Sequence, residues 1–366
     1  MVAELEATPL KRLAIPDAAE LETRLVLKKC VAAQTAIAEL RVAGHMFANP
    51  AVGTGPLILL EAKDSCQIAN VVTAIDPLFS AASGIKAKDG GAAQQVLRYR
   101  ATLLSAAASA KSEPPSVTTA LCLARALAAD TARAALGEAR LAEQLADWAR
   151  LQSDDAEMDP LVRLAVSQYQ LASLQPFALA TGPVARILSL LSLMRSGLLD
   201  LPALNLSRHL LDTKADYDRT LAGVMASGDW PPFLDYVLTA VEQSARWSSG
   251  KLRATRAMID MAGRHIRRHA PKIYSQELVE LIFAEPYTCI SHIVDAGIAK
   301  RQTASVYLKQ LDRIGILRER RVGRNKVFIH RKYMYLLTRD DNAVTPYPDP
   351  AVIAAAPSAP APSTES

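Results

Sequence analysis

Apolar positions recur at three- and four-residue spacing through most of the chain. The spacing is present in residues 21–47, 56–80, 94–110 and 117–149, in segments that are rich in alanine. Side chains three and four positions apart lie on one face of an α-helix, and alanine favours that conformation more than any other residue. The pattern therefore predicts an all-α body that extends to about residue 270.

Two further helices are predicted on either side of a proline step. The first begins at Asp159 and ends at Gln175, immediately before Pro176. The second ends at Gly197, because glycine readily adopts the backbone conformation that closes a helix. Asp229 and the two prolines that follow it closely favour the start of another helix.

The segment after residue 270 has a different pattern. Three short helices are predicted over residues 275–283, 290–297 and 303–314, and two runs with alternating apolar positions follow them. A Gly-Arg-Asn turn at residues 323–325 joins these runs and predicts a β-hairpin. Three helices followed by a hairpin make a winged helix, in which the third helix can enter the DNA major groove.

Positive charge is concentrated in this same segment. Residues 264–332 contain fifteen lysines and arginines against six acidic residues, a net charge of +9 in a chain whose total is +5. The third helix is expected to bury Ala304, Leu308 and Leu311 and to turn its polar side outward, while the hairpin arginines meet phosphates. The residues assigned to this double-stranded DNA interface are Gln302, Thr303, Ser305, Lys309, Arg313, Arg318, Arg320, Arg321, Arg324 and Lys326.

The winged helix leaves two interpretations open. It can serve as a protein-interaction module, in which case its arginines only form a solvated surface. The concentration of positive charge favours DNA instead. A DNA-binding protein of this kind is expected to form a homodimer, because operator symmetry matches two-fold protein symmetry.

Composition argues against several other classes of protein. No apolar run reaches the length of a membrane span, and residues 1–6 are acidic where an export signal would be basic. The four cysteines lack Cys-x-x-Cys spacing, and His265 and His269 have no third ligand near them in sequence. We therefore expect a cytoplasmic protein with no membrane segment, disulfide framework or metal site. The segment from Asp341 on, rich in proline and alanine, is expected to be disordered.

Several segments, in order along the chain, resemble the Fic family. They are residues 38–40 with 49–50, residues 60–70, residues 159–170 and residues 228–230. The resemblance spans roughly residues 20–338 and implies an all-α Fic-like helical core with a C-terminal winged-helix domain of three helices and a small β-hairpin. The domains that it implies are an N-terminal segment 1–20, an N-terminal Fic-type helical region 21–115, a degenerate Fic core 116–262, the winged helix 263–340 and the tail 341–366.

Residues 174–186 are similar to the active-site loop of that family. In active members the loop's histidine is the general base on a protein hydroxyl, its acidic residue holds magnesium, and its glycines and arginines bind ATP, so that AMP is transferred. Here Gln175 stands at the histidine position, Leu179 at the acidic position and Pro183 at the first arginine. A carboxamide has no useful basicity, and leucine cannot bind a hard cation.

The loop keeps several residues that shape it. Gly182 and Arg186 match the family pattern, as do the proline and phenylalanine after Gln175, whereas Ala180 and Thr181 replace the family's glycine and asparagine. Thr181, Gly182 and Arg186 could still bind an anion or a nucleotide at a helix N-terminus. ATP and Mg²⁺ are implied as cofactors only if the site retains this binding.

Two further features of the family are missing from the sequence. The inhibitory glutamate, which competes with the ATP γ-phosphate for the last arginine, is replaced by Ala69, and Asn70 follows in place of glycine. The hairpin that docks target peptides by strand addition has no counterpart in residues 124–148, which are helix formers nearly throughout. We therefore expect no catalytic residue and no AMP transfer.

The leading hypothesis is a catalytically inactive Fic-like protein that acts as a winged-helix DNA-binding regulator of transcription. One alternative is residual Fic-type nucleotide binding or protein adenylyltransferase activity. Another is an adaptor or toxin–antitoxin component that binds a protein partner through the helical body.

Overall fold

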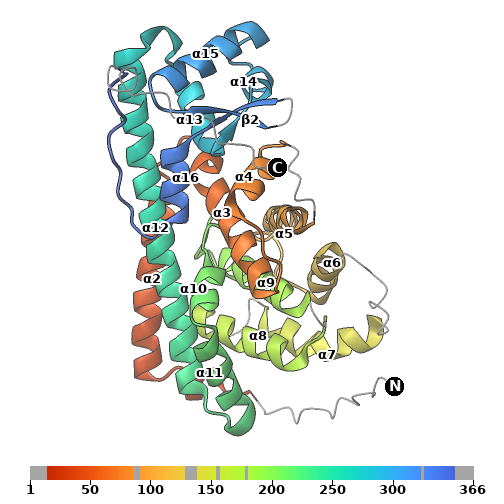
Figure 1. Cartoon of the computed structure of the whole chain (residues 1–366). Coiled ribbons are helices and arrows are strands. Elements are labelled where there is room, and N and C mark those ends of the chain that lie inside the picture. The colour runs from red at the N-terminus through yellow and green to blue at the C-terminus, as the bar shows by residue number, and fades with distance from the viewer. Residues whose placement is uncertain are drawn as a thin grey trace. The chain divides into compact units, whose positions relative to one another are not determined.

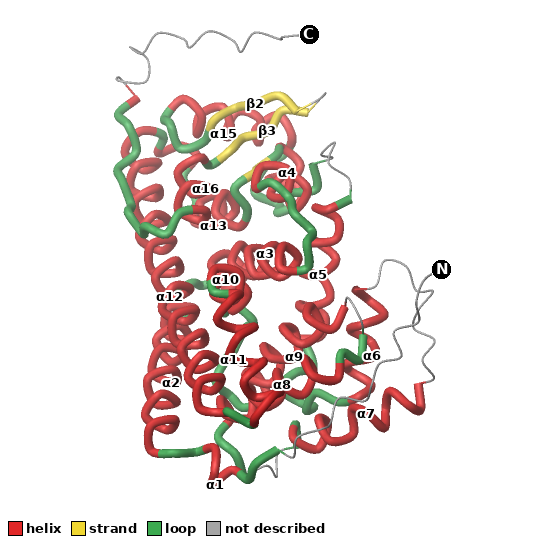
Figure 2. The backbone as a smooth tube through the Cα atoms, turned by 60° about the horizontal axis from the view of Figure 1, so that its bottom comes forward, coloured by secondary structure: helices red, strands yellow, loops and turns green. Residues whose placement is uncertain are grey.

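The computed structural model describes residues 15–85, 91–127, 138–153, 157–177, 180–322 and 325–350. Helices dominate these residues, and their strands belong to one small sheet near the C-terminus (Figures 1 and 2). This arrangement confirms the predicted all-α core with a C-terminal winged helix. None of the described helices combines the length and the apolar character that crossing a lipid bilayer requires.

The chain divides into two compact units. Unit 1 comprises Met1–His45, Leu57–Leu78 and Ala87–Ser249, and unit 2 comprises Met46–Pro56, Phe79–Lys86 and Gly250–Ser366. The helices of the first 249 residues are α1 (Ala18–Leu21), α2 (Arg24–Gly44), α3 (Pro50–Ile68), α4 (Ile75–Ala82), α5 (Ala92–Ala107), α6 (Val117–Leu127), α7 (Glu138–Leu151), α8 (Pro160–Leu174), α9 (Thr181–Arg195), α10 (Leu206–Asp212), α11 (Lys214–Ser227) and the first half of α12 (Trp230–His269).

Helices α8 and α9 pack against each other in unit 1. The Asp159 carboxylate accepts a hydrogen bond from the Leu161 N–H at 2.8 Å and caps α8, whose first residue is proline. The helix ends at Gln175, which has a left-handed backbone with φ 46°. Gly197, with φ 73°, follows the end of α9. The predicted start of α8 and the predicted ends of both helices are therefore confirmed.

The apolar pattern of residues 56–80 is divided between two helices. Helix α3 begins before this stretch at Pro50, where Asn49 Oδ1 accepts the Ala51 N–H at 3.1 Å. It ends at Ile68, and Asn70 then takes a left-handed conformation with φ 64°. Asparagine tolerates this conformation better than most residues, so the chain turns there before α4. Hydrophobic spacing alone does not reveal such a turn.

Residues 124–148, where we expected no target-docking hairpin, are helical as far as the structure describes them. Helices α6 and α7 cover its two ends. Residues 128–137 lie outside the described residues, so the expectation for them is not tested. The described residues of this region form no strand.

A winged helix occupies much of unit 2. Its elements are α13 (Gln276–Ala284), β1 (Tyr287–Thr288), α14 (Ile290–Asp295), α15 (Arg301–Arg313), β2 (Arg318–Val322) and β3 (Asn325–Ile329), followed by α16 (Arg331–Thr338). The antiparallel sheet has the order β1-β3-β2, and Tyr287 pairs with Ile329 while Arg318 pairs with the same residue from the other side. The predicted helices and hairpin are present, whereas β1 was not predicted because two residues carry no measurable alternation.

Residues 340–350, called the strap, lie against other residues of unit 2 through hydrogen bonds from Lys251, Lys332 and Tyr347. The Tyr347 ring is buried and lies edge-on to the ring of His330, with 5.9 Å between the ring centroids, and its hydroxyl lies 3.0 Å from His330 Nε2. His330 Nδ1 accepts the Tyr333 N–H at 3.1 Å, so the neutral ring donates from Nε2 to Tyr347. Burial lowers the pKa of His330 to about 3 and keeps it neutral. This packing corrects the expectation of disorder for residues 341–350, because one buried aromatic side chain anchors a segment that has no apolar periodicity.

Candidate functional site

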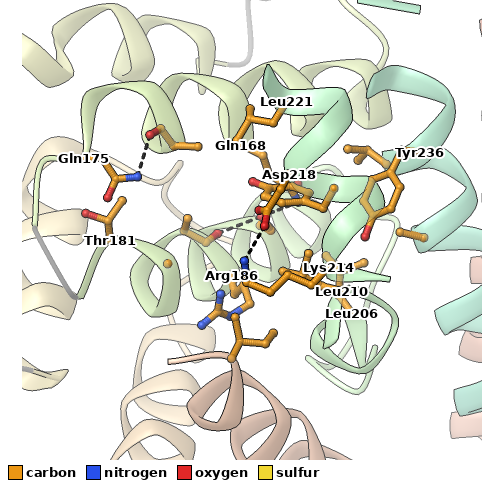
Figure 3. Close-up of a pocket in the computed structure, with 18 residues that line it drawn as sticks. Gln168, Gln175, Thr181, Arg186, Leu206, Leu210, Lys214, Asp218, Leu221 and Tyr236 are labelled. Atoms are coloured by element: carbon orange, nitrogen blue, oxygen red, sulfur yellow. Dashed lines mark hydrogen bonds and ion pairs between the residues drawn. The ribbon is translucent and has the colours of Figure 1, made fainter. Parts of the chain in front are cut away.

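A cavity of about 250 Å³ lies among α8, α9, α10, α11 and α12 within unit 1 (Figure 3). Gln175, Thr181, Gly182 and Arg186, which the sequence assigns to the degenerate loop, all line it. In Figure 3 Gln175 and Thr181 lie at one side of the cavity and Tyr236 at the other, with Arg186 between them. The structure therefore brings the predicted loop residues together at one concave site.

Gln175 is held by its own helix. Its Nε2 donates to the Ala172 carbonyl at 2.7 Å, and its backbone N–H donates to Leu171 O at 3.1 Å. Both interactions satisfy carbonyls at the end of α8 that have no intrahelical partner. Because a carboxamide cannot accept a proton near neutral pH, this position supplies no general base.

Thr181 and Gly182 form the first turn of α9. Thr181 Oγ1 accepts the Phe177 N–H at 3.0 Å and thereby closes the loop. A Cβ at Gly182 would lie 3.1 Å from Arg186 Nη1, so glycine leaves room for the arginine. Ala178 and Leu179 lie outside the described residues, and the position of the family's acidic residue is therefore not described.

Arg186 is buried, with 8% of its surface exposed. Its Nε donates to Ser65 Oγ at 2.6 Å and its Nη2 donates to Ser65 O at 2.9 Å. Among the described residues Nη1 has no hydrogen-bond partner, and the side chain lines the cavity. Two nitrogens of the guanidinium are thus engaged by Ser65 of α3, while the side chain lines the cavity.

The partner of Arg186 on α3 differs from the one that the family resemblance suggests. The family's inhibitory acid corresponds to Ala69, which lies beyond the end of α3. Ser65, four residues earlier in the chain, holds the arginine instead, and it does so with neutral groups. These contacts leave the charge of the guanidinium without a carboxylate hydrogen-bonded to it.

A buried carboxyl group lies behind this contact. Glu61 of α3 accepts the Ser207 N–H at 2.9 Å and the Ser207 hydroxyl at 2.5 Å, and the Tyr99 hydroxyl lies 3.5 Å away. Burial raises the pKa of Glu61 to about 7, although the bonds from Ser207 and the charge of Arg186 oppose the rise. These residues fix α3 to the start of α10. No sequence pattern indicated that they would meet, because they are far apart along the chain.

The raised pKa of Glu61 predicts a dependence of stability on pH. The free energy contributed by this group is fully present below its ordinary pKa of 4.5 and is lost as pH rises through about 7. We expect the unfolding free energy to fall over this window, and Glu61→Gln to flatten that fall because glutamine keeps a neutral acceptor for Ser207. Urea denaturation at a series of pH values measures both. An unchanged slope in Glu61→Gln would contradict the assignment.

Three polar cavity residues on α11 are among those that the sequence analysis did not predict. Lys214 and Asp218 form an ion pair of 2.6 Å on α11, and Tyr217 lies between them in sequence. Burial raises the pKa of Tyr217 to about 12, so its hydroxyl remains a neutral donor. The i,i+4 spacing of the ion pair is that of any exposed helix pair, so no local signal separates it from ordinary surface residues.

The outward side of α15 carries the residues predicted to face DNA. Ala304, Leu308 and Leu311 are completely buried, as predicted. Gln302, Thr303, Lys309 and Arg313 are exposed and Ser305 is half-buried; these five residues are called the α15 face. The helix thus presents a polar, cationic surface while its apolar side is fixed in the winged-helix core.

The hairpin formed by β2 and β3 is called the wing. Arg318, Arg320, Arg321 and Lys326 are exposed on it, and Arg324 lies outside the described residues. Lys326 forms an ion pair of 2.5 Å with Glu319, and Arg321 is opposite Lys326 in the strand register. The wing is consequently basic, with one acidic residue partly neutralising Lys326.

The histidines of α12 make ordinary structural contacts. The rings of His265 and His269 lie 4.5 Å apart between centroids, and His265 Nε2 lies 2.8 Å from the Ile314 carbonyl. Among the described residues no group of three His, Cys, Asp or Glu side chains could hold a metal ion.

Two family models match the ends of the chain. The model described as "Fic/DOC family N-terminal" matches residues 27–108, and "Protein adenylyltransferase SoFic-like, C-terminal domain" matches residues 258–333. Among curated proteins, the protein adenylyltransferase fic-1 of Caenorhabditis briggsae is 34% identical over 137 residues, which cover 37% of this chain and 24% of the relative. The chain thus matches about a quarter of the length of that relative.

Solved structures with the same fold cover more of the chain. A Fic family protein from Desulfovibrio desulfuricans G20 aligns over 84% of this chain and 96% of its own, with a TM-score of 0.53 and 15% identity. Fic-1 from C. elegans aligns over 62% of this chain and 73% of its own, with a TM-score of 0.50 and 23% identity. At these identities the likeness concerns the fold alone.

Proposed function

The chain belongs to the Fic family, and we propose that it binds duplex DNA through its winged helix as a regulator of transcription and no longer transfers AMP. The observation that carries this proposal is the α15 face. Four of its five residues are exposed and Ser305 is half-buried, on a helix whose opposite side is completely buried. A helix presented in this way fits the major groove of B-DNA, which is about 12 Å wide.

Charge supports the same interpretation. Lys309 and Arg313 lie on the α15 face, and Arg318 and Arg321 lie exposed on the wing that follows it. Phosphate contacts of this kind hold a protein in register on the duplex, and they release condensed counterions when they form. The combination of a groove-sized helix and flanking cations favours DNA over a protein partner, for which no such concentration of charge is needed.

The test is the salt dependence of binding to a random-sequence duplex pool. If these four cations and Lys326 each neutralise a phosphate, the logarithm of the binding constant should fall with the logarithm of salt concentration with a slope of about −4.5. Fluorescence anisotropy at increasing salt measures the slope. Binding that is absent at low salt, or that ignores salt, contradicts the proposal and favours a protein-binding winged helix. The mass of the protein–DNA complex tests the expected homodimer, since a dimer places two copies of the chain on one duplex.

A second candidate function rests on Arg186 Nη1. This nitrogen lacks a partner among the described residues and lines the cavity beside Thr181 and Gly182, at the N-terminus of α9. A helix N-terminus together with an arginine favours an anion such as the phosphate of a nucleotide. We expect ATP to bind without a requirement for Mg²⁺ and Arg186→Leu to abolish this binding. Calorimetric titration of the chain with ATP, with and without Mg²⁺, measures this binding. Absence of binding heat under both conditions would rule out nucleotide binding at this cavity.

The loss of AMP transfer is tested separately. Incubation with α-labelled ATP, Mg²⁺ or Mn²⁺ and a cell extract is expected to label no protein, and Gln175→His alone is not expected to restore labelling because Pro183 still replaces an arginine. Label that appears with the unaltered chain and disappears in Arg186→Leu would establish adenylyltransferase activity instead.

A further inference from the structure

An apolar side chain lies at the centre of the exposed side of α15. Gln302, Val306, Lys309 and Arg313 follow one another at helical spacing and form a single stripe. Val306 is 51% exposed, whereas the other aliphatic residues of the helix, Ala304, Leu308 and Leu311, are completely buried. The proposed phosphate contacts account for the cations of the stripe but not for Val306.

The winged-helix core fixes where this valine points. Because Ala304, Leu308 and Leu311 occupy the core, α15 cannot rotate to bury Val306 without exposing them. Gln302 and Val306 lie one turn apart in the N-terminal half of the helix, the part of a recognition helix that contacts base edges. Lys309 and Arg313 follow toward its C-terminus.

We propose that this part of α15 reads adenine–thymine pairs, with the Gln302 carboxamide on an adenine edge and the Val306 side chain against a thymine methyl group. The inference rests on the proposed DNA binding and adds its sequence preference. A glutamine can donate to adenine N7 and accept from its N6 amino group. Thymine is the one unmodified base with a methyl group in the major groove, so an isopropyl side chain has an apolar partner only there.

The charged residues of the stripe supply affinity without sequence preference. Lys309 and Arg313 would contact phosphates, which are the same at every base pair. Discrimination therefore falls to Gln302 and Val306, and a guanine–cytosine pair offers Val306 no methyl group. Val42 on α2, 66% exposed, provides a matched control because it is as accessible but lies in unit 1.

The experiment begins with selection of duplexes from a random pool, followed by replacement of single thymines with uracil in the best duplex. Uracil differs from thymine only by the lost methyl group. At one position we expect about a fourfold loss of affinity, the value of one buried methyl contact. Val306→Ala should bring this ratio close to one, Val306→Thr should keep part of it because one methyl remains, and Val42→Ala should leave it unchanged.

Gln302 is tested in the same duplex with 7-deazaadenine, which removes only the N7 acceptor. We expect at least about a fivefold loss at one adenine with the unaltered chain and none with Gln302→Ala. Equal affinity for thymine and uracil duplexes, or a ratio that persists in Val306→Ala, overturns the assignment of Val306 while DNA binding stands. Absence of salt-dependent binding to any duplex overturns the proposed function itself.

Discussion

Replacement of Lys309, Arg313, Arg318 and Arg321 together with alanine is expected to weaken duplex binding roughly a hundredfold near 0.1 M salt and to reduce the salt slope by about 3.6. The physical reason is the loss of four phosphate contacts and of the counterions that they release. All four side chains are exposed, so the fold should tolerate their removal. Anisotropy titrations at several salt concentrations measure both quantities.

A matched variant separates local contacts from overall charge. Alanine at Arg24, Lys28, Arg219 and Arg246 removes the same number of positive charges from exposed positions of unit 1. Its affinity should change only slightly, because distant charges are screened beyond about 8 Å at physiological salt. If both variants lose affinity equally, the winged helix is not the site of binding. If neither variant loses affinity, the proposal that these residues bind DNA is wrong.

Lys251→Met is expected to cause the largest loss of stability, about 3 kcal/mol in the unfolding free energy. Lys251 of α12 is completely buried, and its Nζ donates to Leu336 O at 2.8 Å, to Asp341 O at 3.1 Å and to Arg339 O. The ammonium group thus satisfies carbonyls at the end of α16 and at the start of the strap. Methionine keeps the packing volume but leaves these acceptors without a donor. Urea denaturation measures the loss.

Lys300→Met provides the comparison, because Lys300 is exposed in the same unit. Its unfolding free energy should stay within about 0.5 kcal/mol of the unaltered chain. Hydrogen exchange adds a local readout, since Lys251→Met should also increase exchange in the strap around Tyr347. Equal stability of the two variants would show that the buried ammonium group contributes nothing beyond packing.

Local signals predicted much of the fold. Asp159 and the proline after it indicated the start of α8, and the spacing of Ala304, Leu308 and Leu311 identified the buried side of α15. These features depend on neighbours within one or two helical turns, which is the range over which a sequence pattern is informative. The order of the helices and the hairpin was predicted for the same reason.

Local sequence patterns predicted only part of the candidate site. The degenerate loop indicated Gln175, Thr181, Gly182 and Arg186, and the structure places all four at one cavity. The sequence did not indicate that Ser65 holds Arg186, since the two residues are 121 positions apart and neither has an unusual neighbourhood. The sequence likewise did not indicate that Lys214 and Asp218 line the cavity, because their position there depends on how α11 packs.

The amino-acid sequence alone was enough to predict a Fic-like body, a loop without a base at Gln175, and a basic winged helix with a defined outward side. Tertiary packing was needed to show how Arg186 is held, how Glu61 is buried, and that Tyr347 anchors a strap where composition indicated disorder. The division has one cause. Helix periodicity, caps and net charge are properties of nearby residues, whereas buried polar contacts form between segments whose meeting depends on the whole fold.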